Sequence, residues 1–114
     1  MIIVTAKIAF SSQSHRDRAV ELSTNVQQAT RDEESGCHAY CFSADPCDPV
    51  TMQVYELWED SDSLVAHFDH PNYLAMLEIF TNNGLVGSES RAYLTERNEP
   101  VYGPNSEKKT AFFE

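Results

Sequence analysis

The chain has 114 residues, which is enough for one domain and too few for two ordinary ones. Its composition, 41% hydrophobic and 23% charged, is that of a globular domain and excludes a disordered or fibrous chain. The 18 acidic and 8 basic residues give a formal net charge of −10, which argues against nucleic acid and anionic membranes as partners, because both attract clustered Lys and Arg. Three cysteines, an odd number, favour a reducing compartment, so we expect a cytoplasmic protein.

The first part of the chain predicts a strand followed by a helix. Residues 2–10 place apolar side chains at alternate positions, which is typical of a half-buried strand. The polar segment 11–14 offers helix N-caps, and apolar residues then recur at helical spacing to about residue 34. Gly36 is expected to end this helix in a left-handed conformation.

The middle of the chain predicts a hairpin and two short helices. Strands are expected over 37–43 and 51–59, joined by a loop that contains two prolines. A short helix is expected over 64–68 after an acidic N-terminal turn. A second helical segment begins at Pro71, a residue suited to a first turn, and ends at Gly84.

A fourth strand is expected over 91–97, so the order of elements is β-α-β-β-α-β. This order predicts an α+β fold of the ferredoxin-like type, a four-stranded antiparallel sheet with helices on one face. The other face must be polar or covered. Ala6, Ala39 and Tyr55, which we place there, do not make it polar, and a partner is therefore expected. Residues 98–114 contain two prolines and a glycine and are expected to form an irregular tail.

Five short segments between residues 31 and 73 carry a more specific signal. They are Arg31-Asp-Glu-Glu-Ser-Gly-Cys-His-Ala-Tyr40, the loop dipeptides Asp45-Pro and Asp48-Pro, Tyr55-Glu-Leu-Trp-Glu-Asp60, Leu64-Val-Ala-His67 and Pro71-Asn-Tyr73. Together they resemble the antibiotic biosynthesis monooxygenase domain family. The resemblance implies a dimeric α+β barrel, in which residues 1–97 of two subunits pack their ferredoxin-like sheets face to face. Members of that family oxidise polyphenols, hydroquinones or anthrones with O₂ and no cofactor, degrade haem, isomerise small metabolites, or have no known activity.

The sequence departs from the family pattern at informative positions. In the anthrone-type enzymes a catalytic asparagine stands four residues before the tryptophan, and here that position is Val54. In the haem-degrading relatives an aromatic residue and a histidine stand ten apart on the second helix, where this chain has His67 and Leu77. The first strand also lacks the asparagine of those relatives, so haem is not expected.

Trp58 and Glu56 share one face of the third predicted strand. They either line a pocket, with the indole stacking on a flat aromatic substrate, or serve the fold. In the second case Trp58 belongs to the core and Glu56 pairs with Arg91 or Arg31.

His67 is the candidate catalytic residue. An imidazole can take a proton from a phenol or a C–H group near neutral pH, which is the first task of a cofactor-free oxygenase. The alternative is a partly buried histidine whose ring nitrogens bind backbone groups. Tyr40 either orients an oxygenated ring or packs in the sheet, and the resemblance adds Asn72 and Tyr73 to the substrate pocket.

No cofactor and no metal are expected. None of the four glycines forms a phosphate-binding loop of the kind that holds flavin or nicotinamide. His67 and His70 lack a third ligand. Cys37 and Cys41 lie roughly 13 Å apart on an extended strand, too far to share a metal.

The expected function is therefore that of a cofactor-independent monooxygenase acting on a small aromatic polyol, quinol or anthrone-like compound. The alternative is a small-molecule isomerase, or a non-catalytic ligand-binding dimer, on the same fold. In either case we expect a homodimer. The tail, residues 98–114, is expected to pack on the partner subunit because it carries Val101, Tyr102, Phe112 and Phe113.

Overall fold

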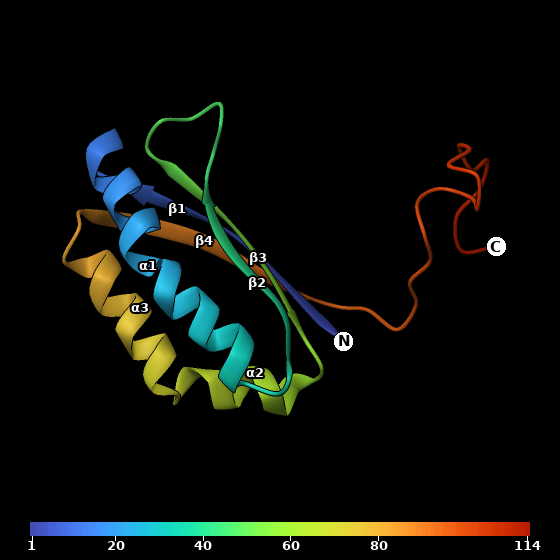
Figure 1. Cartoon of the computed structure of the whole chain (residues 1–114), viewed down its shortest axis with the longest axis horizontal. Helices are drawn as coiled ribbons and strands as arrows, with labels where there is room; N and C mark the ends of the chain where they lie inside the picture. The colour runs from blue at the N-terminus through green and yellow to red at the C-terminus, as the bar shows by residue number, and fades with distance from the viewer.

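A computed structural model describes all residues, 1–114, and shows a sheet of four strands with three helices (Figure 1). The elements in chain order are β1 (Ile2–Phe10), α1 (Gln13–Glu33), β2 (Cys37–Ala44), β3 (Thr51–Trp58), α2 (Ser61–Phe68), α3 (Pro71–Thr81) and β4 (Leu85–Leu94). No helix is both long enough and apolar enough to cross a membrane.

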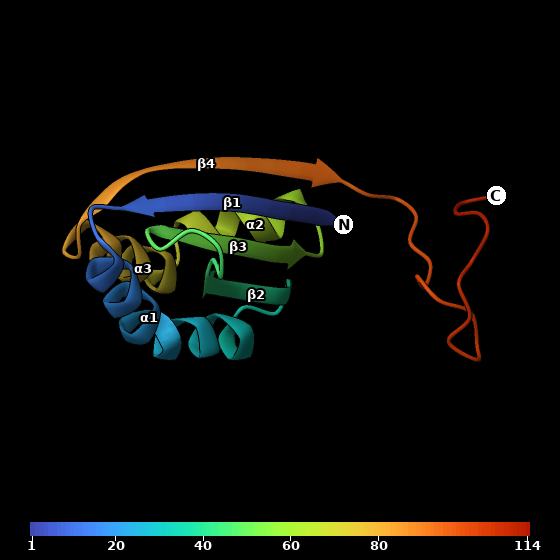
Figure 2. The same ribbon diagram turned by 90° about the horizontal axis from the view of Figure 1, so that it is seen from above.

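The four strands are antiparallel and lie in the order β2-β3-β1-β4, with β2 and β4 at the two edges of the sheet (Figure 2). This is the ferredoxin-like arrangement, and the predicted fold class is confirmed. The central strand β1 is aligned residue by residue with both neighbours, so that Ala6 lies opposite Val54 on β3 and Ser90 on β4. This register places Ala6 against the core beneath the helices, so its expected position on the uncovered face is wrong.

The core lies between one face of the sheet and the three helices. Alternate residues of β1, β2 and β3 point into it, as the alternating sequence predicts. Its buried hydrophobic residues are Ile8, Phe10, Ala19, Tyr40, Phe42, Met52, Val54, Trp58, Met76 and Phe80.

The opposite face of the sheet has a mixed character. Tyr55 and Tyr93 are exposed there, beside Thr5, Cys41 and Arg91. This surface, which we call the open face, is neither fully polar nor covered by any part of the same chain.

The start of α1 follows the sequence and its end does not. The Ser12 hydroxyl accepts a hydrogen bond from the His15 N–H at 3.1 Å, as an N-cap does. The helix ends at Glu34 in an extended conformation, and Gly36 does not adopt a left-handed one, so that expectation is wrong. A Cβ atom at Gly36 would lie 2.2 Å from Ser63 Oγ, and glycine is therefore needed for the close approach to α2.

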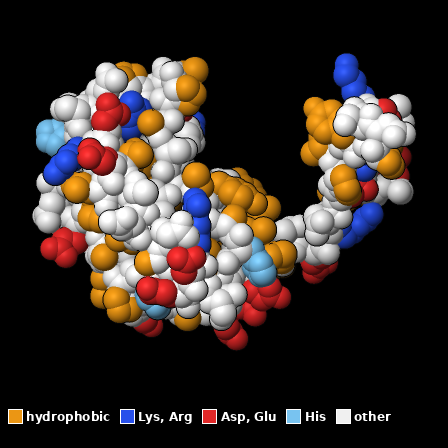
Figure 3. Space-filling model, viewed as in Figure 1, with side chains coloured by type: hydrophobic (Ala, Val, Ile, Leu, Met, Phe, Trp, Pro, Cys, Tyr) orange, Lys and Arg blue, Asp and Glu red, His pale blue; other side chains and the backbone are white.

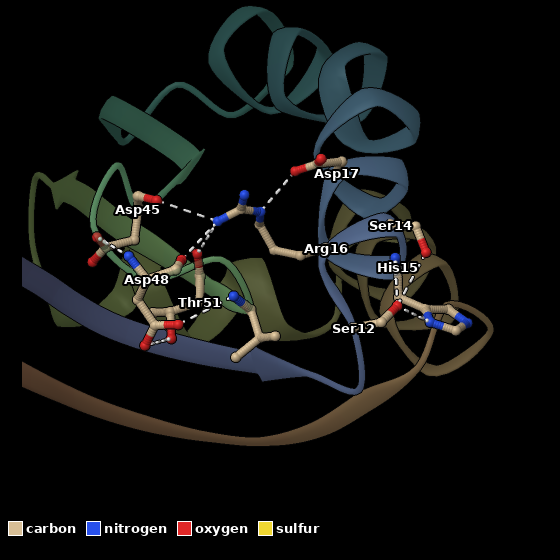
Figure 4. A network of polar contacts seen from close by, with 9 residues as sticks. Ser12, Ser14, His15, Arg16, Asp17, Asp45, Asp48 and Thr51 are labelled. Atoms are coloured by element: carbon tan, nitrogen blue, oxygen red, sulfur yellow. Dashed lines mark hydrogen bonds and ion pairs between the residues drawn. The ribbon is translucent and has the colours of Figure 1, made fainter.

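The loop between β2 and β3 is fixed to α1 by Arg16 (Figure 4). The guanidinium Nη1 donates to the carbonyl oxygens of Asp45, Asp48 and Thr51, and Nε donates to Asp17 at 2.8 Å. Arg16 is buried, so these bonds replace the water that the charge loses. The arginine fixes the end of the β2–β3 hairpin that lies near the start of α1.

β4 begins at Leu85, before the expected residue 91, and ends at Leu94, before the expected residue 97. After Leu85 and Val86 the segment 87–90 contains a glycine and three polar residues, so 85–90 has no alternating strand pattern of its own. It becomes a strand because it pairs with β1 along its whole length, with a register shift after Ala9. Nine of the ten β4 residues are exposed, which means that the helices leave this strand largely uncovered.

The tail leaves the domain after β4 and stands away from it (Figure 1). It folds back on itself through a bridge between Tyr102 and Lys108 and an ion pair between Lys109 and Glu99 at 3.1 Å. Figure 3 shows hydrophobic side chains on the side of the tail that faces the domain across the gap. Val101, Tyr102, Phe112 and Phe113 are all exposed.

Candidate functional site

An apolar cavity of about 320 Å³ lies between the helix-bearing face of the sheet and helices α2 and α3. Fourteen of its 19 lining residues are hydrophobic, so a ligand there is held mainly by apolar contact. The lining residues Phe68, Leu77 and Ser90 are exposed, which puts the mouth of the cavity between the α2–α3 pair and β4.

His67, near the end of α2, lies in the wall of this cavity and is 3% exposed. Its Nδ1 lies 2.7 Å from Glu34 Oε1. A carboxylate only accepts hydrogen bonds, so Nδ1 carries a hydrogen, and in the neutral imidazole Nε2 is the free base. Nε2 makes no hydrogen bond with the protein, and no fully buried side-chain nitrogen or oxygen lacks a partner. Nε2 therefore keeps access to the cavity.

Glu34 is the functional residue that sequence reasoning missed. Its side chain is 8% exposed at the end of α1, and it contacts both α2 and α3. Glu34 Oε1 contacts His67, as described above. The other oxygen, Oε2, accepts a hydrogen bond from Asn72 Nδ2 at 3.3 Å and lies 3.8 Å from His70 Nδ1. The sequence feature that could have identified Glu34 is the Glu34-Ser-Gly-Cys37 segment, which is part of the family resemblance but does not indicate what the glutamate does.

Three aromatic side chains surround the His67 imidazole. The indole of Trp58 lies 4.7 Å from it between ring centroids, Tyr40 lies at 5.4 Å, and Tyr73 lies at 5.5 Å. This packing fixes the plane of the imidazole, and Glu34 fixes its tautomer. Burial raises the pKa of the Tyr40 phenol well above its ordinary value, with the nearby carboxyls of Glu56 and Glu34 adding to the rise, so this hydroxyl stays neutral.

Glu56 brings a carboxyl group into the cavity wall, and its side chain is buried. The indole Nε1 of Trp58 donates to Glu56 Oε1 at 2.9 Å. No lysine or arginine pairs with it: Arg31 donates instead to the Tyr40 carbonyl. Burial raises the pKa of Glu56 to about 7; the hydrogen bond from Trp58 opposes the rise, and the charge of Glu34 adds to it.

The six residues expected at the site fall into two groups. Tyr40, Glu56, His67 and Tyr73 line the cavity. Trp58 and Asn72 do not: Trp58 lies behind His67 and Glu56, and Asn72 donates to Glu34 and Glu33 outside the cavity.

Two further observations limit the chemistry of the site. Val54, at the position of the asparagine in anthrone-type enzymes, lines the cavity and supplies no polar atom there. No group of three or more His, Cys, Asp and Glu side chains is arranged to hold a metal ion.

Comparison with solved structures finds the same fold in proteins of low sequence identity. A candidate antibiotic biosynthesis monooxygenase from Deinococcus radiodurans is 22% identical with a TM-score of 0.78, over 90% of this chain and 100% of that one. One from Caulobacter crescentus is 15% identical with a TM-score of 0.73, over 81% and 86%. SnoaB, a cofactor-independent oxygenase from Streptomyces nogalater, is 10% identical with a TM-score of 0.65, over 87% and 96%. At these identities the likeness establishes the fold alone.

The family of the chain follows from a match to a family model, not from single sequences. No curated protein sequence matches the chain. Residues 1–79 match the family model described as antibiotic biosynthesis monooxygenase. That segment is more than half of the 114 residues and includes β1 to β3, α2, most of α3 and every candidate residue above. The chain therefore belongs to the antibiotic biosynthesis monooxygenase family.

Proposed function

We propose that the protein is a cofactor-independent monooxygenase that oxidises a small aromatic polyol, quinol or anthrone-like compound with O₂. The observation that carries the proposal is the His67–Glu34 pair, whose free Nε2 opens into an apolar, aromatic-lined cavity. The name of the structural neighbour SnoaB, a cofactor-independent oxygenase, supports the same class of reaction.

The chemistry begins with a proton transfer. His67 Nε2 takes a proton from a phenolic O–H or an activated C–H of the substrate, and Glu34 stabilises the imidazolium that forms. The resulting phenolate or carbanion is electron-rich enough to give an electron to O₂. The apolar wall excludes water from this anion, and the neighbouring aromatic rings suit a flat substrate.

Val54 favours a second candidate, a small-molecule isomerase or a non-catalytic ligand-binding dimer. Without an amide at this position the cavity lacks a group that the resemblance associates with anthrone oxidation. An isomerase would use the same base, since His67 could remove a proton and return it to another carbon. The two candidates differ in one observable, the consumption of O₂.

The partner of the domain is, in this proposal, a second copy of the same chain. A copy seated on the open face would cover Tyr55 and Tyr93 and remove more than about 1,000 Å² from water, which is the range of a stable interface. The tail would then have a neighbouring subunit to pack on, which its exposed Phe112 and Phe113 require.

The test is oxygen uptake with a panel of hydroquinones and anthrones. His67→Ala should lower turnover by about 10²–10⁴-fold, the usual effect of removing a general base. The matched control is His38→Ala, because His38 is an exposed histidine that pairs with Glu59 away from the cavity. Substrate turnover without O₂ uptake would support the isomerase. Equal loss in both variants, or none in either, would remove His67 from the mechanism.

A further inference from the structure

Glu56 is a buried carboxyl group that the base mechanism does not use. It lies on β3 opposite Val4 of β1 and Tyr40 of β2, on the face of the sheet that forms the cavity wall. Oε1 accepts the Trp58 N–H, whereas Oε2 makes no hydrogen bond with the protein. Because no fully buried oxygen lacks a partner, Oε2 keeps access to the cavity. Glu56 is also the only carboxyl group among the lining residues.

No lysine, arginine or histidine forms an ion pair with Glu56. Arg91, the one arginine among the lining residues, lies opposite Thr5 in the register and so on the other face of the sheet from Glu56. Glu34 approaches from α1, and His67 from α2 already pairs with it. Of the titratable groups of β2, Tyr40 and Cys37 lie near Glu56, whereas His38 and Cys41 are exposed. β1 contributes the apolar Val4. An anion here would be desolvated and would face a second carboxylate, so the neutral acid is the favoured form.

The raised pKa of Glu56, about 7, agrees with this geometry. A neutral carboxyl has one O–H donor, and Oε1 is engaged as an acceptor for Trp58. The hydrogen therefore resides on Oε2, the oxygen with access to the cavity. Trp58 contacts both ionisable groups, since its N–H binds Glu56 and its ring packs against the His67 imidazole. A base and an acid consequently lie in one cavity.

We propose that Glu56 is a catalytic acid, which donates a hydrogen bond from Oε2 to an oxygen of the bound ligand and delivers its proton during oxygen transfer. The inference deepens the proposed function and rests on it for the catalytic step. It also narrows the ligand: a compound suited to this cavity carries a carbonyl or phenolic oxygen within reach of Glu56 and an acidic proton within reach of His67.

The steps balance for a substrate with a CH₂ group, such as an anthrone. His67 takes the first C–H proton, and the carbanion combines with O₂, the oxidant, to give a carbon-bound peroxide anion. Glu56 protonates the outer peroxide oxygen. Its carboxylate then takes the second C–H proton as the O–O bond breaks, which gives the C=O product and hydroxide. The hydroxide leaves as water with the proton from His67, and both residues regain their starting states.

The first experiment needs no ligand, because Trp58 is the only tryptophan and its N–H bonds directly to Glu56. The indole N–H resonance of ¹⁵N-labelled protein is followed from pH 5 to pH 9. We expect a transition near pH 7 in the wild type that is absent from Glu56→Gln. The control is His67→Gln, which removes the imidazole that packs against the indole and should keep the transition. No transition in the wild type, or one that survives in Glu56→Gln, would overturn the inference.

The second experiment tests the catalytic role with 1,8-dihydroxyanthrone as the probe. Glu56→Gln keeps a hydrogen-bond donor but cannot transfer a proton, so its Kd should stay within about threefold while oxygen uptake falls by about 10²–10⁴-fold. Uptake at the wild-type rate in Glu56→Gln would show that Glu56 is not the acid. If the wild type consumes no O₂, the proposed function fails, while the indole titration still decides whether Glu56 is a neutral acid at the cavity.

Discussion

Replacing Glu56 with glutamine should make the folded protein more stable at alkaline pH. The carboxyl has an ordinary pKa of 4.5, which applies to the unfolded chain, and a pKa of about 7 in the folded chain. Between these values the folded state holds a proton that the unfolded state has lost, so the free energy of unfolding falls as the pH rises through this window. The loss of stability that comes from ionising Glu56 in the folded protein is absent below pH 4.5 and complete above pH 7. Glutamine does not ionise, so the variant avoids this loss.

The size of the effect follows from the same two values. Each tenfold change in proton affinity corresponds to about 1.4 kcal/mol, so a rise from 4.5 to about 7 corresponds to about 3 kcal/mol at pH 8. Glu56 is only 8% exposed, and solvent screening therefore reduces this figure little. Glutamine can still accept the Trp58 N–H, so the hydrogen bond behind the cavity wall is kept.

The assay is urea unfolding of the wild type and Glu56→Gln at pH 5 and pH 8. The variant should gain about 2–3 kcal/mol relative to the wild type between the two pH values. Glu78→Gln is the matched control: Glu78 is exposed on α3, and its replacement should change stability by less than about 0.5 kcal/mol at either pH. A difference between Glu56→Gln and the wild type that is the same at pH 5 and pH 8 would refute the reasoning, because Glu56 would then be ionised throughout.

Two further predictions concern the edges of the domain. Deleting residues 99–114 should weaken self-association or lower Tm, because the deletion removes the aromatic residues that we propose pack on the partner subunit. Analytical ultracentrifugation and thermal unfolding measure these two properties. An unchanged dimer constant together with an unchanged Tm would show that the tail packs on nothing. Gly36→Ala should cost about 1–3 kcal/mol, because its Cβ would lie 2.2 Å from Ser63 Oγ. Ser63→Gly should restore most of that loss in the double variant, and a failure to do so would mean that Gly36 is needed for another reason.

The parts of the fold that were predicted from the sequence are those in which burial is local and periodic. The alternation over residues 2–10 reports a strand with one face in the core, and the N-cap of α1 depends on a side chain three residues from its donor. The first half of β4 was missed, because residues 85–90 become a strand only through pairing with β1. Gly36 was assigned the wrong role for a similar reason, since its constraint comes from Ser63 on a different helix.

The candidate site was also predicted only in part from the sequence. His67, Tyr40 and Glu56 were singled out because their residue types suit proton transfer and aromatic contact, and they line the cavity. Glu34 was passed over because its importance depends on the end of α1 meeting α2 and α3, which no local pattern describes. Trp58 was a candidate for the substrate pocket because Trp58 and Glu56 share one face of the strand, but only the carboxyl reaches the cavity.

The exposed position of β4 has a consequence for how the family can diversify. Ser88, Ser90 and Ala92 line the cavity from a strand that the helices leave largely uncovered, whereas His67 and Glu56 lie in the packed part of the domain. Substitutions at these three positions can change the size and polarity of the cavity without opening a void in the core. In the proposed mechanism, the residues that shape the ligand cavity on β4 are therefore separate from those that transfer protons. New ligand preferences can arise on β4 by single mutations at little cost in stability.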